Sequence, residues 1–326
     1  MKKLNTFSII IIVFFSLFIP VLITFRNHFL FGTALIVGKW IFILLAFYFL
    51  RLSSKRDSPR WLKQSLYFTT FFLIAEIGVS YFQSYSLDSN SSEKEVSLMS
   101  YNLFFKNRSP NQIIQLIKRH NPDILVVQEL TPKWKIQLNN SIGSIYQFKR
   151  LKSLRGTHGL GIYSKYPIIK SRYIPKKSRP FAQVVELNID TKKIQIINTH
   201  LASPAIAVEN PDRFLSLFKK NTQQRTEQFE TINAEIDNNK FNAQIIIGDL
   251  NTTVYEPLYR NIQNEWSDLN STDGSMFNFN FPNTRKLGPI IMLDYIFLRG
   301  NVNGEDFKVI QGGSSDHLAI LGKVKI

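Results

Sequence analysis

The 326-residue sequence contains no cysteine, and this absence excludes several kinds of chemistry. Disulfide bonds, thiolate nucleophiles and cysteine-ligated metal sites cannot form. Histidine is scarce too, with five residues and no His-x-x-x-His pair, so a zinc site is disfavoured. The lack of cysteine fits an exported protein but does not establish export, since many cytosolic chains also lack it.

Acidic residues are also few, with 24 against 40 Lys and Arg, for a net charge of +16. Residues 1–82 contribute +7 of this charge and the remainder contributes +9. A basic soluble part suits a polyanionic partner such as nucleic acid or an anionic lipid head group. On charge alone, a solvated lysine-rich surface is the simpler interpretation. The length suggests two domains, or one large domain with an extension.

Three apolar runs dominate residues 1–82, at 7–25, 29–50 and 66–82. Each has about 17–22 residues, enough to cross the hydrocarbon core of a bilayer. The first exceeds the usual apolar stretch of a signal peptide, and no small-residue cleavage site follows it. We therefore predict an N-terminal transmembrane anchor of three helices. Lys39 and Glu76 lie within the second and third runs, where they either pair with each other or extend separately toward the interface.

The distribution of basic residues predicts how this anchor is oriented. Lys2 and Lys3 precede the first run, and five Lys or Arg residues lie in the segment 51–65 between the second and third. Positive segments stay in the cytoplasm, so three spans place everything after residue 82 outside, at the inner or plasma membrane. If the third run lies on the surface instead, the large domain is cytoplasmic. Residues 83–95 are polar and Ser-rich, typical of a linker, and the domain that follows covers 96–326.

The sequence of this domain predicts more strands than helices. Strand patterns occupy 96–103, 124–128, 144–150, 159–164, 168–174, 181–189, 193–199, 241–247, 290–299 and 318–326. Helical spacing covers 111–120, a short segment after Pro132, and 213–238 with a possible break near Asn221. Hairpin-like pairs that alternate with two or three helices indicate an α/β or α+β fold with mixed sheets.

Polar residues follow several of these strands at the point where each apolar run ends. They are Asn102, Glu129, His200, Asp249, Asn251, Asp316 and His317, with Asp294 inside its predicted strand. Carboxylate and amide oxygens form a ligand set of the Mg²⁺ or Mn²⁺ type. A hard cation with histidine and asparagine nearby suits attack by water on phosphorus.

Seven short motifs occur in an order that resembles the endonuclease/exonuclease/phosphatase superfamily. They are Ser100-Tyr-Asn102, Gln128-Glu129, Gly159-x-x-Ile-Tyr-Ser164 with Tyr166-Pro167-Ile168, Asn198-Thr-His200-Leu, Gly248-Asp-Leu-Asn251, Asp294-Tyr-Ile-Phe297 and Ser315-Asp-His317. This superfamily includes pancreatic-type deoxyribonucleases, apurinic endonucleases, neutral sphingomyelinases and inositol-polyphosphate phosphatases. The resemblance covers residues 96–326 and implies a four-layer αββα sandwich with its site at one edge of the two sheets.

The resemblance also implies a role for each matching residue. Asn102 and Glu129 would hold a Mg²⁺ or Mn²⁺ ion, with Glu129 as the central ligand and Asp316 as a further ligand or a second-site carboxylate.

The remaining residues would carry the catalytic steps. Asp249 would orient and deprotonate the attacking water, and Asn251 would bind the phosphoryl oxygen. His317, oriented by Asp294, would contact the scissile phosphate, and His200 would stabilise the transition state or protonate the leaving oxygen. In having His200, the sequence resembles the deoxyribonuclease and sphingomyelinase branches rather than the apurinic endonucleases.

Three further segments each allow two interpretations. Arg225 with Gln228 resembles a family position near the phosphate, but a solvated helix face is at least as plausible. The basic cluster 176–179 favours a solvated loop over contact with a polyanion. The apolar loop 276–281 fits either a lipid surface or ordinary packing under the sheet edge.

We therefore expect a membrane-tethered, Mg²⁺- or Mn²⁺-dependent hydrolase of a phosphodiester, either in nucleic acid or in a phospholipid head group. One alternative is a phosphomonoesterase that acts on an inositol-phosphate-like substrate. Another is a non-catalytic, membrane-tethered binding module of the same fold. The expected partners are the phosphoester substrate and the lipid bilayer, and no protein partner is evident from the sequence.

Overall fold

The computed structural model describes residues 67, 94–236, 240–272, 278–284 and 288–326. The predicted anchor, apart from residue 67, and nearly all of the predicted linker therefore lie outside the described residues. Contacts divide the chain into two compact units. The larger comprises 84–252 and 262–326, and only residues 67 and 253–261 of the smaller are described. Across the described ranges, no helix is long and apolar enough to cross a membrane.

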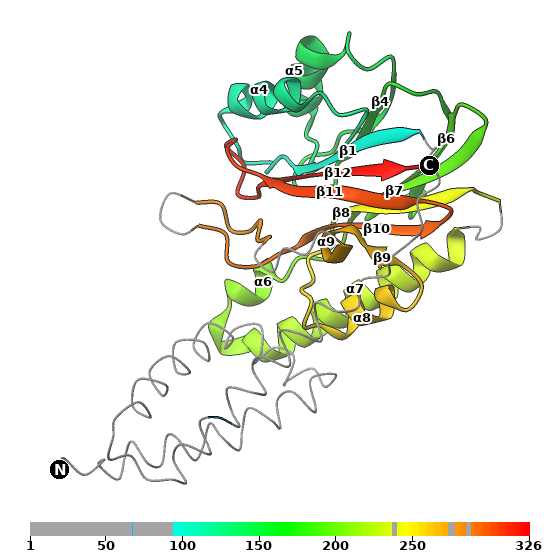
Figure 1. Ribbon diagram of the computed structural model, residues 1–326. Coiled ribbons are helices and arrows are strands. Elements are labelled where there is room, and N and C mark those ends of the chain that lie inside the picture. The colour runs from blue at the N-terminus through cyan, green and yellow to red at the C-terminus, as the bar shows by residue number, and fades with distance from the viewer. Residues whose placement is uncertain (1–66, 68–93, 237–239, 273–277, 285–287) are drawn as a thin grey trace, which may run out of the picture. The chain divides into compact units, whose positions relative to one another are not determined.

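Two six-stranded sheets form the larger unit (Figure 1). The first has the order β11-β12-β1-β2-β4-β3. Its strands are β1 (Glu95–Asn102), β2 (Ile124–Gln128), β3 (Phe148–Lys152), β4 (Leu160–Ser164), β11 (Asn303–Ile310) and β12 (Ala319–Lys325). The second has the order β5-β6-β7-β8-β10-β9. Its strands are β5 (Ile168–Ile174), β6 (Ala182–Ile189), β7 (Lys192–His200), β8 (Ala243–Asp249), β9 (Ser267–Asp268) and β10 (Asp294–Gly300).

The longer helices α4 (Pro110–His120), α5 (Pro132–Ile142) and α7 (Phe214–Glu235) cover the outer faces of the two sheets. The shorter elements are α6 (Ala205–Val208), the 3₁₀ turn η1 (Pro211–Arg213), α8 (Pro257–Gln263) and α9 (Leu269–Thr272). Figure 1 shows α4 and α5 on one side of the paired sheets and α7 on the other. Two mixed sheets with flanking helices confirm the predicted α+β sandwich.

Successive side chains of β1 and β2 point to opposite faces of the first sheet, so that one face packs against helices α4 and α5 and the other faces the second sheet. Met99, Tyr101 and Val127 belong to one apolar cluster with the buried residues of α4 and α5. Side chains of the opposite parity, such as Ser100 and Gln128, point toward the second sheet, because successive strand residues face opposite sides. Each strand is therefore buried on both faces, and this burial explains the continuous apolar runs in the sequence.

Each sheet contains one parallel pair at its centre, and these two pairs create the functional edge. β1 pairs in parallel with β2, and β7 pairs in parallel with β8. Parallel neighbours need a crossover connection, which α4 supplies in the first sheet and the α6–α7 segment in the second. The C-terminal ends of these four strands consequently meet at the edge on the left of Figure 1, where β12 begins.

Most predicted strands are confirmed, with ends that differ by a few residues. Several features differ, and the short elements α6, α8, β9 and α9 were not predicted. The predicted break near Asn221 is wrong, because α7 runs unbroken from Phe214 to Glu235 around the buried Phe218, Phe229 and Ile232. Asp294 is the first residue of β10 rather than an interior one. The strand β11 was not predicted, because a register irregularity between Glu305 and Lys308 disrupts its alternation.

Candidate active site

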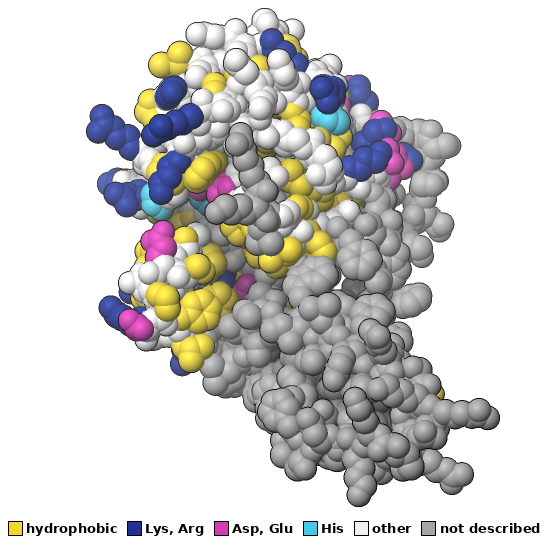
Figure 2. Space-filling view, turned by 90° about the vertical axis from the view of Figure 1, so that its left-hand side faces the viewer, with side chains coloured by type: hydrophobic (Ala, Val, Ile, Leu, Met, Phe, Trp, Pro, Cys, Tyr) yellow, Lys and Arg dark blue, Asp and Glu magenta, His cyan; other side chains and the backbone are white. Residues whose placement is uncertain are grey.

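The structure brings together the eight predicted site residues at one edge of the sandwich. Asn102, His200 and Asp249 end strands β1, β7 and β8, and Glu129 follows β2 directly. Asp294 begins β10 opposite Asp249 in the antiparallel register. Asn251 follows β8, and Asp316 and His317 precede β12. Figure 2 faces this edge.

Asp249 is the central group of this arrangement. Its buried Oδ2 accepts a hydrogen bond from Asn102 Nδ2 at 3.0 Å. Two imidazole nitrogens face the same oxygen, His200 Nε2 at 3.5 Å and His317 Nε2 at 3.7 Å. Its Oδ1 accepts from the backbone N–H of Asn251 at 2.9 Å. Four partners from separate segments thus hold one carboxylate in a single orientation.

The surroundings of Asp249 favour a carboxylate that accepts protons. Burial raises the pKa of Asp249, and the nearby carboxylate of Asp294 raises it further, whereas His317, His200 and Asn102 oppose the shift. A raised pKa makes the ionised group a stronger base. This carboxylate is therefore chemically suited to take a proton from a neighbouring water.

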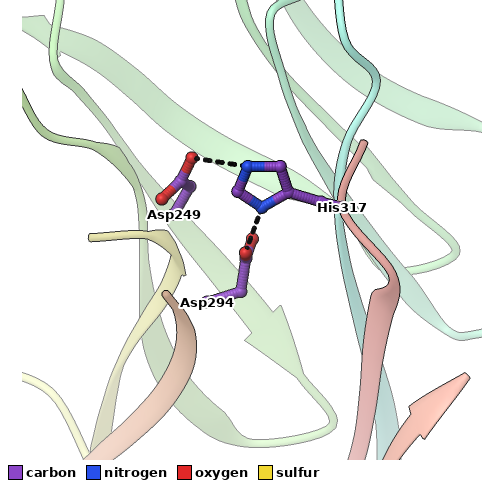
Figure 3. A group of neighbouring side chains, drawn as sticks. All are labelled: Asp249, Asp294 and His317. Atoms are coloured by element: carbon purple, nitrogen blue, oxygen red, sulfur yellow. Dashed lines mark hydrogen bonds and ion pairs between the residues drawn. The ribbon is translucent and has the colours of Figure 1, made fainter. Parts of the chain in front are cut away.

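His317 lies between two acids (Figure 3). Its Nδ1 lies 2.7 Å from Asp294 Oδ2, and its Nε2 faces Asp249. Burial lowers the pKa of His317, but the carboxylates of Asp294 and Asp249 outweigh this effect and raise it to about 10. The imidazole is therefore a cation near neutral pH and can donate hydrogen bonds from both nitrogens.

His200 is oriented by the backbone rather than by an acid. Its Nδ1 lies 3.0 Å from the carbonyl oxygen of Thr157. A carbonyl only accepts, so Nδ1 carries a proton in this contact. The other nitrogen, Nε2, faces Asp249 at 3.5 Å and Glu129 Oε1 at 4.0 Å. His200 therefore presents Nε2 toward the carboxylates of the site.

The predicted metal ligands provide oxygen atoms at the same edge. Glu129 adopts a positive φ of 56° immediately after β2, and its Oε2 accepts from the backbone N–H of Phe105 at 2.8 Å. A left-handed glutamate is strained, which is typical of a functional position. Asn102 Oδ1 accepts from Phe104 N at 3.0 Å and keeps a second lone pair.

Asp316 completes the oxygen set, and its surroundings fit a bound cation. Burial raises the pKa of Asp316, and the nearby Glu129 carboxylate raises it further, against the opposing effect of His317. A divalent cation held by Glu129 and Asp316 would offset this repulsion between carboxylates. The donor chemistry is that of Mg²⁺ or Mn²⁺.

A second group of potential ligands, Asp249, Asp294 and His317, has donor atoms that lie within 4.8 Å of one another. We do not interpret it as a metal site. The two carboxylates face different nitrogens of one ring (Figure 3), and a protonated imidazole has no lone pair for a metal. Instead, His317 is hydrogen-bonded to Asp294 on one side and ion-paired with Asp249 on the other.

Asn280 and Phe281 belong to the site edge, although the sequence did not predict them as site residues. Asn280 is fully buried, donates from Nδ2 to Asp294 Oδ2 at 2.5 Å and accepts from Leu293 N at 2.9 Å. The ring of Phe281 lies 4.7 Å from that of His317. Within its described part, 278–281, the loop proposed as a lipid contact is therefore packed against the site. No local pattern distinguishes Asn280 from its polar neighbours.

Arg225 and Gln228 also act differently from the solvated helix face considered above. Arg225 is 0% exposed and donates from one guanidinium nitrogen to the carbonyl oxygen of Ala202 at 3.2 Å. Gln228 Oε1 accepts from Ala202 N at 2.8 Å. The solvated interpretation is wrong for Arg225, and both side chains hold the backbone two residues beyond His200.

Exposed cations surround this edge on three loops. They are Lys106 and Arg108 after β1, Arg155 before β4, and Lys176, Lys177 and Arg179 before β6. Among the described residues, none of the six forms an ion pair. At the opposite edge, two surface lysines do form ion pairs, Lys323 with Glu95 at 3.1 Å and Lys325 with Glu305 at 2.8 Å. The site edge is therefore poised to meet negative charge.

Comparison with known proteins agrees with this geometry. Residues 99–317 match the model of the Endonuclease/Exonuclease/phosphatase family. The chain belongs to that family. No curated protein matches the chain. The family name covers nucleases and phosphatases, which hydrolyse phosphate esters.

Solved structures of the same fold include DNA complexes. D. rerio TDP2 complexed with a single-strand DNA product is 18% identical, with a TM-score of 0.57 over 72% of this chain and 100% of that one. The 3′ phosphatase NExo from Neisseria, bound to a product DNA hairpin, is 15% identical, with a TM-score of 0.54 over 70% and 98%. A functionally unknown conserved protein from Enterococcus faecalis is 17% identical, with a TM-score of 0.55 over 70% and 98%. At these identities, the likeness shows the endonuclease/exonuclease/phosphatase fold.

Proposed function

We propose that this protein hydrolyses a phosphodiester by metal-assisted attack of water on phosphorus. The observation that carries the proposal is the buried Asp249 carboxylate, which two imidazoles face at 3.5 and 3.7 Å while one of them, His317, is bound to a second carboxylate, Asp294. A buried base beside a fixed imidazolium provides a proton acceptor and a cationic donor in one site.

Each residue of the site has a separate role in this reaction. Asp249 orients the attacking water and accepts its proton. Asn251, which donates from Nδ2 to Leu201 O at 3.1 Å, keeps a second N–H for a phosphoryl oxygen. His317 donates to a nonbridging oxygen, and Asp294 keeps its ring aligned. His200 presents Nε2 toward the developing charge or the leaving oxygen.

Glu129, Asp316 and the carbonyl of Asn102 would hold a Mg²⁺ or Mn²⁺ ion. When bound, such an ion polarises the phosphoryl oxygen and offsets negative charge. The positive φ of Glu129 and the bond from Phe105 N keep this carboxylate directed toward the edge. The six exposed cations on the surrounding loops support an anionic substrate.

The full chain provides the test of this proposal. We expect it to cleave bis-p-nitrophenyl phosphate with Mg²⁺ or Mn²⁺, to lose activity in EDTA and to regain it when either ion is added. Asp249→Asn and His317→Gln should each lower kcat by about 10²–10⁴-fold. Asp123→Asn, at the opposite edge, is the matched control. Activity that survives both site substitutions, or that is indifferent to EDTA, would overturn the mechanism.

A parallel set of substrates identifies the ester. DNA, phospholipid vesicles and an inositol phosphate are compared at equal phosphate concentration. Preferred cleavage of the inositol phosphate would indicate a phosphomonoesterase instead. Tight Mg²⁺ or Mn²⁺ binding without any turnover would indicate a binding module.

We further propose that residues 1–82 tether the protein to the membrane and that the site lies outside the cytoplasm. The three apolar runs and the basic segment 51–65 support this arrangement. Alkaline phosphatase fused after residue 95 should be active, and a cytoplasmic fluorescent reporter at the same position should report the opposite topology if the third run does not span.

A further inference from the structure

A small apolar surface lies exposed beside the site. Ile206 and Val208 of α6 and Leu215 of α7 are 60%, 65% and 56% exposed. Among the described residues, only Tyr67, Ile136 and Ile169 are other large hydrophobic side chains with such exposure. Half of this set therefore falls within ten consecutive residues. We call residues 205–215 the aliphatic corner, and Figure 2 shows hydrophobic side chains in the lower part of the site face.

The aliphatic corner rests on a packed base. Ala207, between the two exposed residues of α6, is fully buried. Phe214 stacks on Phe218 with ring centroids 5.5 Å apart, and the Arg225 guanidinium lies 5.9 Å from the Phe218 ring. The exposed side chains therefore project from a packed part of the protein. Polar replacements at their positions leave the contacts beneath them intact.

The corner is also close to the site along the chain. Ala205 follows His200 by five residues, so the two lie within about 18 Å even if the link is fully extended. The link itself is held at Ala202, whose N–H bonds to Gln228 at 2.8 Å and whose carbonyl accepts from Arg225 at 3.2 Å. The corner and the catalytic edge are thus fixed to the same segment.

The segment from residue 205 to residue 220 carries a net charge of +1, from three cations and two acids. Arg213, Lys219 and Lys220 are exposed and form no ion pair within the described part of the chain. Glu209 and Asp212 are the acids between residues 205 and 220. Exposed aliphatic side chains near exposed cations are a feature of surfaces that enter the interface of an anionic bilayer.

This combination distinguishes two partners that basic charge alone does not. The six cations around the site suit nucleic acid or anionic lipid equally, because both present rows of phosphates. Exposed aliphatic side chains gain nothing from nucleic acid phosphates, whereas the hydrocarbon of a bilayer takes them out of water. We propose that the aliphatic corner docks against an anionic phospholipid bilayer and places the catalytic edge at the level of the head groups. The identification of a head-group phosphodiester as the substrate rests on the function proposed above.

A fluorescence experiment tests the docking without reference to activity. The chain contains no cysteine, so Val208→Cys, with Ile206→Cys as a second position, takes one environment-sensitive label. The labelled full chain is reconstituted into vesicles of equimolar phosphatidylcholine and phosphatidylglycerol. Doxyl-labelled lipid should quench the corner label, and iodide should not. Ile136→Cys, on α5, is the matched control, and we expect iodide to quench its label.

Three results would overturn the docking proposal. Quenching of the corner labels by iodide alone would show that the corner faces water. Protection from both quenchers would show that protein covers it, either a second copy or another segment of the chain. Protection that appears only when duplex DNA is added would favour nucleic acid.

An activity experiment then tests the consequence for the substrate. The triple variant Ile206→Ser, Val208→Ser, Leu215→Ser should lose about tenfold or more of the activity on vesicle phospholipid. Its activity on the soluble diester bis-p-nitrophenyl phosphate should stay within about twofold. The control is Ile136→Ser with Ile169→Ser, which removes comparable aliphatic surface elsewhere. Equal loss on both substrates would contradict the proposal, whereas a wild-type chain that is quenched as expected but cleaves neither would contradict only the proposed function.

Discussion

The imidazole of His317 joins Asp294 to Asp249, with Nδ1 2.7 Å from Asp294 Oδ2 and Nε2 3.7 Å from Asp249 Oδ2. The two acids are direct partners in the register of β10 and β8. An antiparallel strand pair thus brings together carboxylates that are 45 positions apart in the sequence. The histidine arrives from the other sheet, so the line closes only when the two sheets pack.

We predict that Asp294→Asn lowers kcat by about 10²–10⁴-fold. The amide has nearly the shape of the carboxylate but lacks the charge that keeps His317 protonated and aligned. KM should change little, because Asp294 is fully buried beneath the imidazole. Steady-state kinetics on bis-p-nitrophenyl phosphate measure the effect, with Asp306→Asn on the exposed strand β11 as the control. An unchanged kcat would remove Asp294 from the mechanism.

We predict that Asn280 positions this line without contacting the substrate. Asn280→Ala removes the donor to Asp294 and should lower kcat by about tenfold or more. Asn278→Ala, in the same loop but farther from Asp294, is the matched control. A general loss of folding would lower activity in both variants. The readout specific to positioning is the Nδ1–H proton resonance of His317, which should shift in Asn280→Ala and stay in place in the control.

We predict that a buried polar bridge stabilises the contact between the sheets. Gln128 Nε2 donates to Asn198 Oδ1 at 2.8 Å, and Asn198 Nδ2 donates to the carbonyl oxygens of Val127 and Gly161 at 3.1 Å each. All of these groups are buried between the two sheets. Asn198→Leu should destabilise the protein by about 1–3 kcal/mol, because each of these partners loses a buried hydrogen bond. Chemical denaturation of the full chain gives this value.

A double-mutant cycle separates the bridge from simple loss of packing. Gln128→Leu together with Asn198→Leu should cost less than the sum of the single changes, because the double variant leaves fewer polar groups unpaired. Strict additivity would show that the two side chains act independently.

We predict a pH dependence of stability from Asp123, far from the site. Burial raises the pKa of Asp123, but hydrogen bonds from the N–H and hydroxyl of Ser97 and from Lys165 outweigh it and hold the pKa below its ordinary value. A depressed pKa stabilises the folded state above the unfolded value of about 4. That contribution is lost as the pH falls through the folded value.

The comparison of wild type with Asp123→Asn tests the direction in which this stability contribution changes with pH. Because the carboxylate is partly exposed, screening limits its contribution to about 1 kcal/mol at neutral pH. The difference in melting temperature between the two proteins should be present at pH 7 and shrink below about pH 4. A difference that grows on acidification would contradict the assignment.

Much of the site was predictable from the sequence because most of its polar residues lie at the ends of apolar strands. The apolar runs 124–128 and 241–247 identify buried strands, and Glu129 and Asp249 lie just after those runs end. The polar residues that hold these groups were less visible. Asn280 lies in an irregular polar segment, and its role depends on a 2.5 Å contact with Asp294. Arg225 has the helical spacing of a surface residue, yet it is buried and donates to the carbonyl oxygen of Ala202.

The sequence by itself determined which chemical groups this protein has for a phosphate ester, where most of its strands lie, and which family it belongs to. Only the tertiary structure decided which groups meet. The pairing of His317 with Asp294, the approach of His200 to Asp249 and the exposure of Ile206, Val208 and Leu215 depend on the register of strands and on the packing of two sheets. Such contacts join residues far apart in the chain, and local patterns of hydrophobicity carry no information about them.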